Sequence, residues 1–137
     1  VEDYTRYVKD GLEHWPPQSG EACMREITLR WEALEAELTG EFSNNQKGDK
    51  GKEGIALFLQ YLFWSNGQPV CLNPLEEALC GLSCKPFNAA ERISFLLDRP
   101  DSFQAFKQLS GLFLEQRKLY AAKQAMTKRK IDKTKKA

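Results

Sequence analysis

The sequence predicts an all-α fold, a compact bundle of five or six helices with a basic C-terminal extension. Apolar residues recur three and four positions apart through most of the chain, which is the spacing of one helical face. Prolines and glycines interrupt this pattern at short intervals, as they do between consecutive short helices. The 137 residues, 42% of them hydrophobic, are enough for a single core, and no internal repeat of fixed period is visible.

The first part of the chain contains two predicted helices and a polar loop. Residues 4–15 carry apolar side chains at helical spacing and end before Pro16, which a helix interior does not accommodate. Residues 21–38 form a longer amphipathic pattern, and Gly40 is the expected end of that helix. The segment 43–52, SNNQKGDKGK, contains no apolar residue and is expected to be a loop.

Residues 55–64, IALFLQYLFW, are apolar on nearly every side of a helix, which predicts a helix in the middle of the bundle. A buried strand has a similar length, but no second strand is predicted to pair with it. Gln60 lies inside this run and needs a hydrogen-bond partner, because an unpaired amide in a core is costly. The run is expected to end in a turn at Asn66-Gly67.

Three later helices are expected, each beginning at a capping residue. In each case Glu or Gln stands three positions after the cap: Asn73 with Glu76, Asn88 with Glu91, and Asp101 with Gln104. Pro100 separates the last two helices, and the apolar stripe of the final helix fades after Met126. We therefore expect a helical domain over residues 1–126 and a basic tail over residues 127–137.

Charge is distributed unevenly along the chain. Residues 117–137 contain nine Lys or Arg and one acid, a net charge of +8, whereas the preceding 116 residues contain 11 basic and 18 acidic groups, a net charge of −7. Such a tail attracts polyanions by charge alone, or serves solubility only. The residues expected to contact nucleic-acid phosphates are Lys118, Lys123, Lys128, Arg129, Lys130, Lys133, Lys135 and Lys136.

Composition indicates a soluble, cytoplasmic protein. No apolar stretch reaches the ~18 residues of a transmembrane helix, and the polar start VEDYTRYVKD contains no secretory leader. The spacing of the four cysteines, Cys23, Cys71, Cys80 and Cys84, is not that of a disulfide-rich domain. We therefore expect reduced, mostly buried thiols.

No catalytic or metal-binding pattern stands out. The four cysteines can be imagined around zinc, but structural zinc sites usually pair cysteines two residues apart. Here Cys80 and Cys84 are four apart, and Cys80 lies within a predicted helix. A cysteine nucleophile would need His14, the one histidine of the chain. The acidic clusters are expected to form solvated helix faces; they are Glu76-Glu77 and Glu32, Glu35 and Glu37. We expect no enzyme activity, no metal and no cofactor.

The segment FLQYLFWSNGQPV, residues 58–70, has two interpretations. As a helix end, Trp64 closes the central helix and Asn66-Gly67 reverses the chain. Alternatively, Trp64, Asn66 and Gln68 line a small recognition surface. Aromatic residues near predicted helix ends, Phe42, Phe87 and Phe103, either pack as staples or remain exposed for a partner.

The same segment, followed by the Asn73-Pro74 helix start, resembles the YpoC-like family of small bacterial proteins. The resemblance covers roughly residues 21–123, and its most specific part is residues 61–70. It implies a cytoplasmic helical protein of Gram-positive bacteria without an assigned activity, encoded near functions of DNA replication and repair. It assigns no catalytic residue.

Two functions of different classes follow as hypotheses. The first is a non-catalytic helical interaction or accessory module that binds a protein partner, with a link to DNA replication or repair. The second is sequence-independent nucleic-acid binding through the basic tail. An enzyme with an unrecognised site, for example around Cys80 and Cys84, is the least favoured. The sequence specifies neither the partner nor the oligomeric state.

Overall fold

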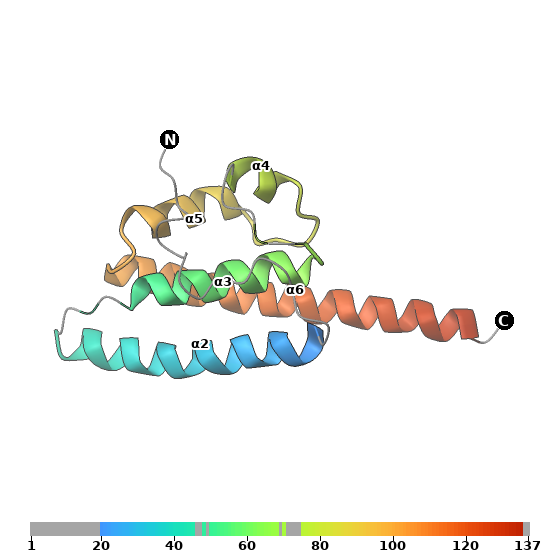
Figure 1. Cartoon of the computed structure of the whole chain (residues 1–137), viewed down its shortest axis with the longest axis horizontal. Coiled ribbons are helices and arrows are strands. Elements are labelled where there is room, and N and C mark those ends of the chain that lie inside the picture. Colours follow the sequence, from blue (N-terminus) through green and yellow to red (C-terminus); the bar gives the residue numbers. More distant parts are fainter. Residues whose placement is uncertain (1–19, 46–47, 49, 69, 71–74, 136–137) are drawn as a thin grey trace.

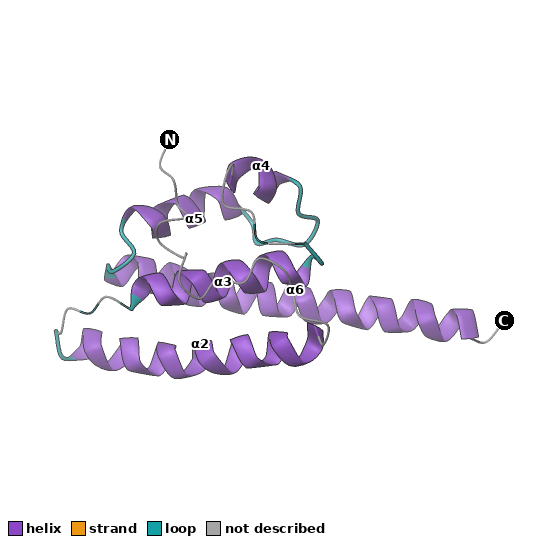
Figure 2. Cartoon of the chain, viewed as in Figure 1, coloured by secondary structure: helices purple, strands orange, loops and turns teal. Residues whose placement is uncertain are grey.

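The computed structural model describes residues 20–45, 48, 50–68, 70 and 75–135, and the side chains within these ranges except those of residues 20–23, 75 and 127–135. The expected helix over residues 4–15 lies outside this part of the chain. Within it the helices are α2 (Gly20–Ser43), α3 (Gly51–Ser65), α4 (Leu75–Cys80), α5 (Ala89–Asp98) and α6 (Phe103–Lys135). The predicted all-α fold is confirmed, since the described residues form helices and no strand (Figure 2).

The helices are arranged around α3. Helices α2 and α6 both pack along α3, α5 packs against α6 and α3, and the short α4 packs against α5 (Figure 1). The contact between α2 and α6 themselves is much less extensive. Helix α6 continues through the expected boundary at residue 126, and its C-terminal part projects beyond the other helices (Figure 1). The basic extension is therefore a continuation of the last helix of the bundle.

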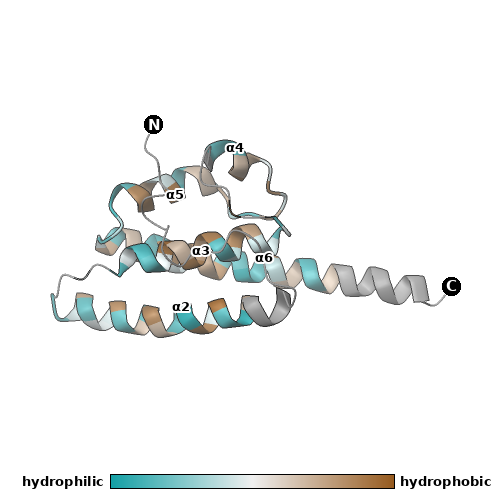
Figure 3. Ribbon diagram, in the orientation of Figure 1, coloured by the Kyte–Doolittle hydropathy of each residue, from teal (hydrophilic) through white to brown (hydrophobic). Residues whose placement is uncertain are grey.

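The core is built on α3, which is mostly apolar along its length (Figure 3). Twelve of its 15 residues are buried, and Phe58, Leu59 and Leu62 are fully shielded from solvent. The predicted central position of this helix is confirmed. The Gln60 amide donates a hydrogen bond to the carbonyl of Ala56, at 3.4 Å, within its own helix.

Aromatic rings join α2, α3 and α6 at one point of the core. Trp31 of α2 stacks on Phe113 of α6, with ring centroids 4.5 Å apart. Phe58 of α3 meets the same Phe113 ring edge-to-face, with centroids 5.2 Å apart. Such pairs contribute about 0.5–1.5 kcal/mol beyond the burial of their area. The three helices consequently share one continuous core.

Helix α3 begins at Gly51, so the expected loop through residue 52 is too long by two residues. Glycine is required there because a Cβ atom on Gly51 would lie 1.9 Å from the carbonyl oxygen of Pro100. One turn later, a Cβ atom on Gly54 would lie 3.0 Å from the Trp31 ring and 2.8 Å from a methyl of Leu109. Close approach of the α5–α6 connection at Gly51, and of α2 and α6 at Gly54, therefore explains two glycines that the sequence pattern assigned to a flexible segment or left unexplained.

The expected end of α2 at Gly40 is wrong, because the helix continues to Ser43. A ring on the added turn accounts for the extension. Phe42 packs against Phe106 and Phe103 of α6, with centroid distances of 5.4 and 5.3 Å. Tertiary contact thus overrides the local preference of glycine to end a helix.

One of the expected helix caps is wrong, and a second is in the expected position but lacks its capping hydrogen bond. Helix α6 starts later than expected, so its cap is Ser102 rather than Asp101: the Ser102 hydroxyl accepts a hydrogen bond from the Ala105 N–H at 3.1 Å. Asn88 does occupy the position before α5, but its backbone is left-handed (φ 53°) and its side chain makes no capping hydrogen bond. The third expected cap, at residues 73–74, lies outside the described residues.

Candidate interaction surface between α2 and α6

A long open groove runs between α2 and α6 on the side away from α3. It exists because these two helices pack on α3 more closely than on each other. It consists of two separate hollows, and the ion pair between Arg117 and Glu32, with 3.6 Å between Nη1 and Oε1, lies at the junction between them. We call the whole feature the α2–α6 groove, and its two hollows the aromatic half and the basic half.

The aromatic half has a volume of about 1110 Å³ and lies near the C-terminus of α2. Its main side chains are Glu32, Glu35, Phe42, Phe103, Phe106 and Lys107. The Lys107 ammonium lies 5.3 Å from the centroid of the Phe103 ring, a cation–π distance. Phe42 is half-buried, whereas Phe103 keeps 44% of its surface exposed. The sequence predicted that each of these rings either packs or remains exposed, and Phe103 is partly packed and partly exposed.

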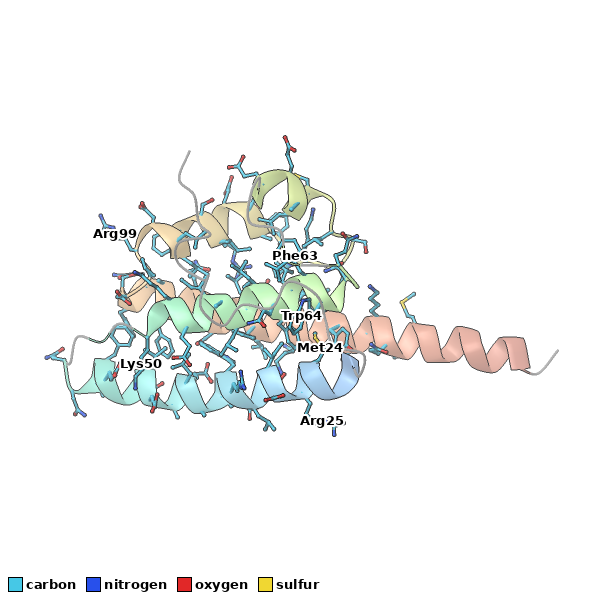
Figure 4. The ribbon with its side chains drawn as sticks, viewed as in Figure 1. Met24, Arg25, Lys50, Phe63, Trp64 and Arg99 are labelled. Atoms are coloured by element: carbon cyan, nitrogen blue, oxygen red, sulfur yellow. The ribbon has the colours of Figure 1, made fainter. Side chains whose placement is uncertain are left out.

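The basic half has a volume of about 590 Å³ and lies near the N-terminus of α2. Its main side chains are Arg25, Tyr61, Leu114, Arg117, Lys118 and Tyr120. Tyr61 belongs to α3 and is buried beneath the groove, where its ring meets Tyr120 edge-to-face at 5.9 Å. Arg25 points outward from α2 (Figure 4). Three cations, Arg25, Arg117 and Lys118, thus line this half together with aromatic and aliphatic groups.

Burial changes the acidity of the tyrosine under the basic half. Loss of hydration disfavours the phenolate and raises the pKa of Tyr61 from 10.0 to about 12, although the nearby Arg117 charge acts in the opposite direction. The phenol is consequently neutral throughout the physiological pH range. It forms part of the floor as an uncharged group and supplies no general base there.

Helical spacing explains why these side chains share one groove. On α6 the residues facing the groove follow each other at intervals of three and four: Phe103, Lys107, Ser110, Leu114, Lys118 and Ala121. The facing stripe of α2 includes Ala36 and Thr39. Because several of these side chains are small, the two helices leave space between them.

The predicted recognition residues near the end of α3 do not form one exposed surface. Trp64 is buried inside the bundle (Figure 4), and Gln68 is exposed. Asn66 donates hydrogen bonds to the carbonyls of Leu62 and Cys84, at 2.8 and 2.7 Å, and its side-chain oxygen accepts the Cys84 N–H. These contacts support the helix-end interpretation, and a recognition role stays a prediction.

A buried glutamine on α6, missed by the sequence analysis, completes this region. Gln116 is fully shielded, and its amide nitrogen donates to the Ser65 hydroxyl at 2.7 Å and to the Cys84 carbonyl at 3.1 Å. Its side-chain oxygen is buried without a partner among the described residues. The only sequence signal was a polar residue at a core-facing position of an apolar stripe, which is a warning of a buried hydrogen-bond network.

A second missed interaction ties α6 to α5. The Arg92 guanidinium donates to both carboxylate oxygens of Glu115 and to the carbonyl of Phe87. This hydrogen-bonded charge holds the pKa of the Glu115 carboxyl below its ordinary value. Phe87 itself remains 81% exposed beside this cluster, so it is not a packed staple.

The predicted phosphate contacts fall in two groups. Lys118 is exposed at the basic half of the groove. Lys123 is exposed on the next turns of α6, and its ammonium donates to the Ser65 carbonyl at 3.2 Å. The side chains of the remaining six, from Lys128 to Lys136, lie outside the described residues. Their role in binding nucleic acid stays a prediction.

The described residues show two of the four cysteines, and both are free thiols. Cys80 is exposed and Cys84 is half-buried, so the expectation of mostly buried thiols is wrong for these two. The side chains of residues 23 and 71 are not described. Within the described residues, no three His, Cys, Asp or Glu side chains gather closely enough to hold a metal ion. Likewise, none of the helices there has the length and hydropathy needed to cross a membrane.

The fold and this surface define a small helical-bundle protein with an open groove between its first and last described helices. Residues 21–128 match the family model described as YpoC-like protein. The chain is also 31% identical, over 102 residues, to "Uncharacterized protein YpoC" of Bacillus subtilis (strain 168). The aligned part is 72% of this chain and 62% of that relative, so the chain spans less than two thirds of the relative's length. No solved structure matches. The chain belongs to the YpoC-like family, as the sequence resemblance predicted.

Proposed function

We propose that this protein is a non-catalytic interaction module that binds a protein partner in the α2–α6 groove. The observation that carries this proposal is the exposure of large apolar side chains inside a groove bounded by two helices. Phe103 is 44% exposed and Leu114 is 53% exposed. Each of these side chains lies in a hollow lined by polar and charged residues as well, and apolar groups surrounded by a polar rim are typical of protein-binding sites.

The chemistry of the groove favours binding over catalysis. Its charged groups include an ion pair between Arg117 and Glu32 and several exposed cations, and its buried tyrosine, Tyr61, has a pKa raised to about 12. Among the described lining residues there is no Cys or His, and Tyr61 is a neutral phenol that supplies no base at neutral pH. The free thiols of Cys80 and Cys84 support the cytoplasm as the location. A link to DNA replication or repair follows from the family resemblance alone.

Photo-crosslinking inside bacterial cells tests the groove directly. A photoreactive residue is placed at Ala36 or at Ala121, which are exposed positions lining the aromatic and the basic half. Ser94 on α5, also exposed, is the matched control on another surface. We expect an adduct of defined mass from both groove positions and none from Ser94. Absence of any adduct from both groove positions contradicts the proposal.

A second candidate function is sequence-independent nucleic-acid binding through α6. It is favoured by the net charge of +8 over residues 117–137 together with a helical backbone that continues to Lys135 beyond the bundle. Binding of this kind weakens steeply with salt as counterions are released. The full chain is compared with a variant lacking residues 127–137 on a mixed-sequence DNA duplex across a salt series. Equal retention of DNA by both contradicts this function.

A further inference from the structure

We infer that the partner segment bound in the α2–α6 groove is an amphipathic helix of about 20 residues, acidic over the basic half and apolar over the aromatic half. This inference rests on the proposed function and specifies the chemistry of its partner. Length, charge and apolar surface of the groove each support it independently.

Length favours a single helix. The two hollows together extend along α2 from Met24 to Ser43 and along α6 from Phe103 to Gln124. At 1.5 Å of rise per residue, each of these stretches is about 30 Å long. A partner helix of about 20 residues would lie along the whole groove. It would contact α2 and α6 in the way that a fourth helix completes a bundle.

Charge defines the half over which the acidic residues lie. Arg25, Arg117 and Lys118 line the basic half, and beyond the junction at Glu32 no described residue of that lining is acidic. The Glu32 carboxylate is 3.6 Å from Arg117, and the described lining residues place no acidic side chain beside Arg25 or Lys118 in the basic half. Acidic residues on a partner would complement this surface and select it over other helices.

Apolar surface defines the side of the partner that faces the groove. Leu114 projects from α6 into the basic half, with Tyr120 and Tyr61 beneath it. In the aromatic half, Phe103 offers 44% of its surface next to the stacked pair of Phe42 and Phe106. Such aromatic clusters are the usual anchor points for a buried aliphatic or aromatic partner side chain.

The aromatic half argues against a nucleic acid as the occupant of the groove. Glu32 and Glu35 line it, and their carboxylates repel a phosphate backbone that would continue from the basic half. Lys107 is drawn over the Phe103 ring, with its ammonium 5.3 Å from the ring centroid. A peptide helix that carries acidic residues at one end and none at the other complements both halves. A uniformly charged polyanion complements the basic half alone.

Two synthetic helical peptides of 20 residues test the inference with the full chain. Both carry the same apolar stripe and an uncharged second half, and they differ in having four glutamates or four lysines on the rim of the first half. Binding is measured by fluorescence anisotropy at low and at moderate salt. We expect the glutamate peptide to bind at least tenfold more tightly than the lysine peptide, with the difference shrinking as salt rises.

Matched charge reversals locate the binding site of the peptide. Lys118→Glu changes the basic half, and Arg99→Glu makes the same change in charge at an exposed position at the end of α5. We expect Lys118→Glu to weaken the glutamate peptide about tenfold and Arg99→Glu to leave its affinity within twofold. Arg25→Glu, on the opposite wall, is expected to weaken it by several-fold. Circular dichroism establishes that each variant is folded.

Four outcomes would overturn the inference. The first is equal affinity for the two peptides, and the second is equal loss for Lys118→Glu and Arg99→Glu. The third is displacement of the glutamate peptide by DNA, since the groove would then hold a polyanion. The fourth is a change in the oligomeric state of the chain with Lys118→Glu alone, since the groove would then hold a second copy. Crosslinks from Ala36 and Ala121 remain informative in each case: with them, only the partner chemistry is wrong, and without them the proposed function fails.

Discussion

The two faces of α6 differ in their exposure to solvent. The inner face, toward α3, is made of residues that are buried without exception: Ala105, Leu109, Leu112, Phe113 and Gln116. The outer face, toward the α2–α6 groove, leaves Phe103, Leu114 and Lys118 in solvent. Hydrophobicity alone does not separate the faces, because leucine and phenylalanine occur on both. The difference indicates that the inner face holds α6 in the bundle, whereas the apolar residues of the outer face remain accessible to a binding partner.

Truncating one leucine on each face gives the largest contrast. Leu112→Ala removes a fully shielded side chain and is expected to lower the free energy of unfolding by about 2–5 kcal/mol, because it leaves a cavity. Leu114→Ala, at 53% exposure, is expected to change it by no more than about 0.5 kcal/mol. Urea denaturation of both variants measures the difference. Equal losses would mean that the outer face also holds the fold together.

Adding a methyl group at a crowded glycine and at an uncrowded one tests how closely the inner face of α6 is packed. In Gly54→Ala the new carbon would lie 2.8 Å from Leu109 of the inner face, so we expect a loss of about 1–3 kcal/mol from overpacking. In Gly111→Ala, within α6, the new carbon meets only Arg92 at an ordinary 3.5 Å. That change is expected to stabilise the protein by about 0.5–1 kcal/mol through helix propensity. Thermal melting of both variants is the measurement, and opposite shifts are expected.

The polar member of the inner face tests whether hydrogen bonding matters there. Gln116→Ala removes the donors to Ser65 and Cys84 and is expected to cost about 1–3 kcal/mol. Gln116→Leu removes the whole amide as well, including the unpartnered side-chain oxygen, but it keeps more of the side-chain volume than alanine does. We expect it to be less destabilising than Gln116→Ala in urea denaturation. Equal losses for the two variants would show that the hydrogen bonds, and not the side-chain volume, account for the contribution of Gln116.

The smallest expected effect is a pH dependence of the stability that Tyr61, beneath the basic half of the groove, contributes to the fold. The pKa of Tyr61 is about 12 in the folded protein and 10.0 in its unperturbed form. The unfolded chain therefore releases this proton first, and stability falls as pH rises from about 10 through about 12. Tyr61→Phe is expected to lose less stability than the wild type between pH 9 and pH 12 in urea titrations. Parallel pH profiles for the two proteins would contradict a raised pKa.

Several features of the fold were predictable because they depend on local pattern. The apolar run at residues 55–64 is hydrophobic on all sides, and burial of α3 is the one way to remove that surface from water. The apolar spacing from Met24 to Leu38 likewise places the buried stripe of α2 correctly. The same reasoning failed at Gly40, where α2 continues because Phe42 packs against rings of α6. It also failed at Asp101, because α6 begins one residue later and is capped by Ser102.

The groove was not predictable in this way. Glu32 and Arg117 are 85 positions apart (117 minus 32) and meet only because α2 and α6 both pack on α3. Sequence analysis treated Glu32 and Glu35 as a solvated helix face and Lys118 as part of a basic tail. Each description is right for one helix taken alone. The groove arises from two such faces side by side.

The sequence by itself determined the all-helical class, the central place of α3, the turn at Asn66-Gly67 and the contrast between an acidic body and a basic C-terminus. These properties follow from residue periodicity and from the sum of charges, which need no knowledge of neighbours in space. Tertiary structure alone decided that Gln116 is buried, that Gly51 cannot carry a side chain, and that Leu114 is exposed beside Arg25 and Lys118. The physical reason is that burial and close approach are properties of pairs of helices, and a helical stripe does not state which partner will cover it.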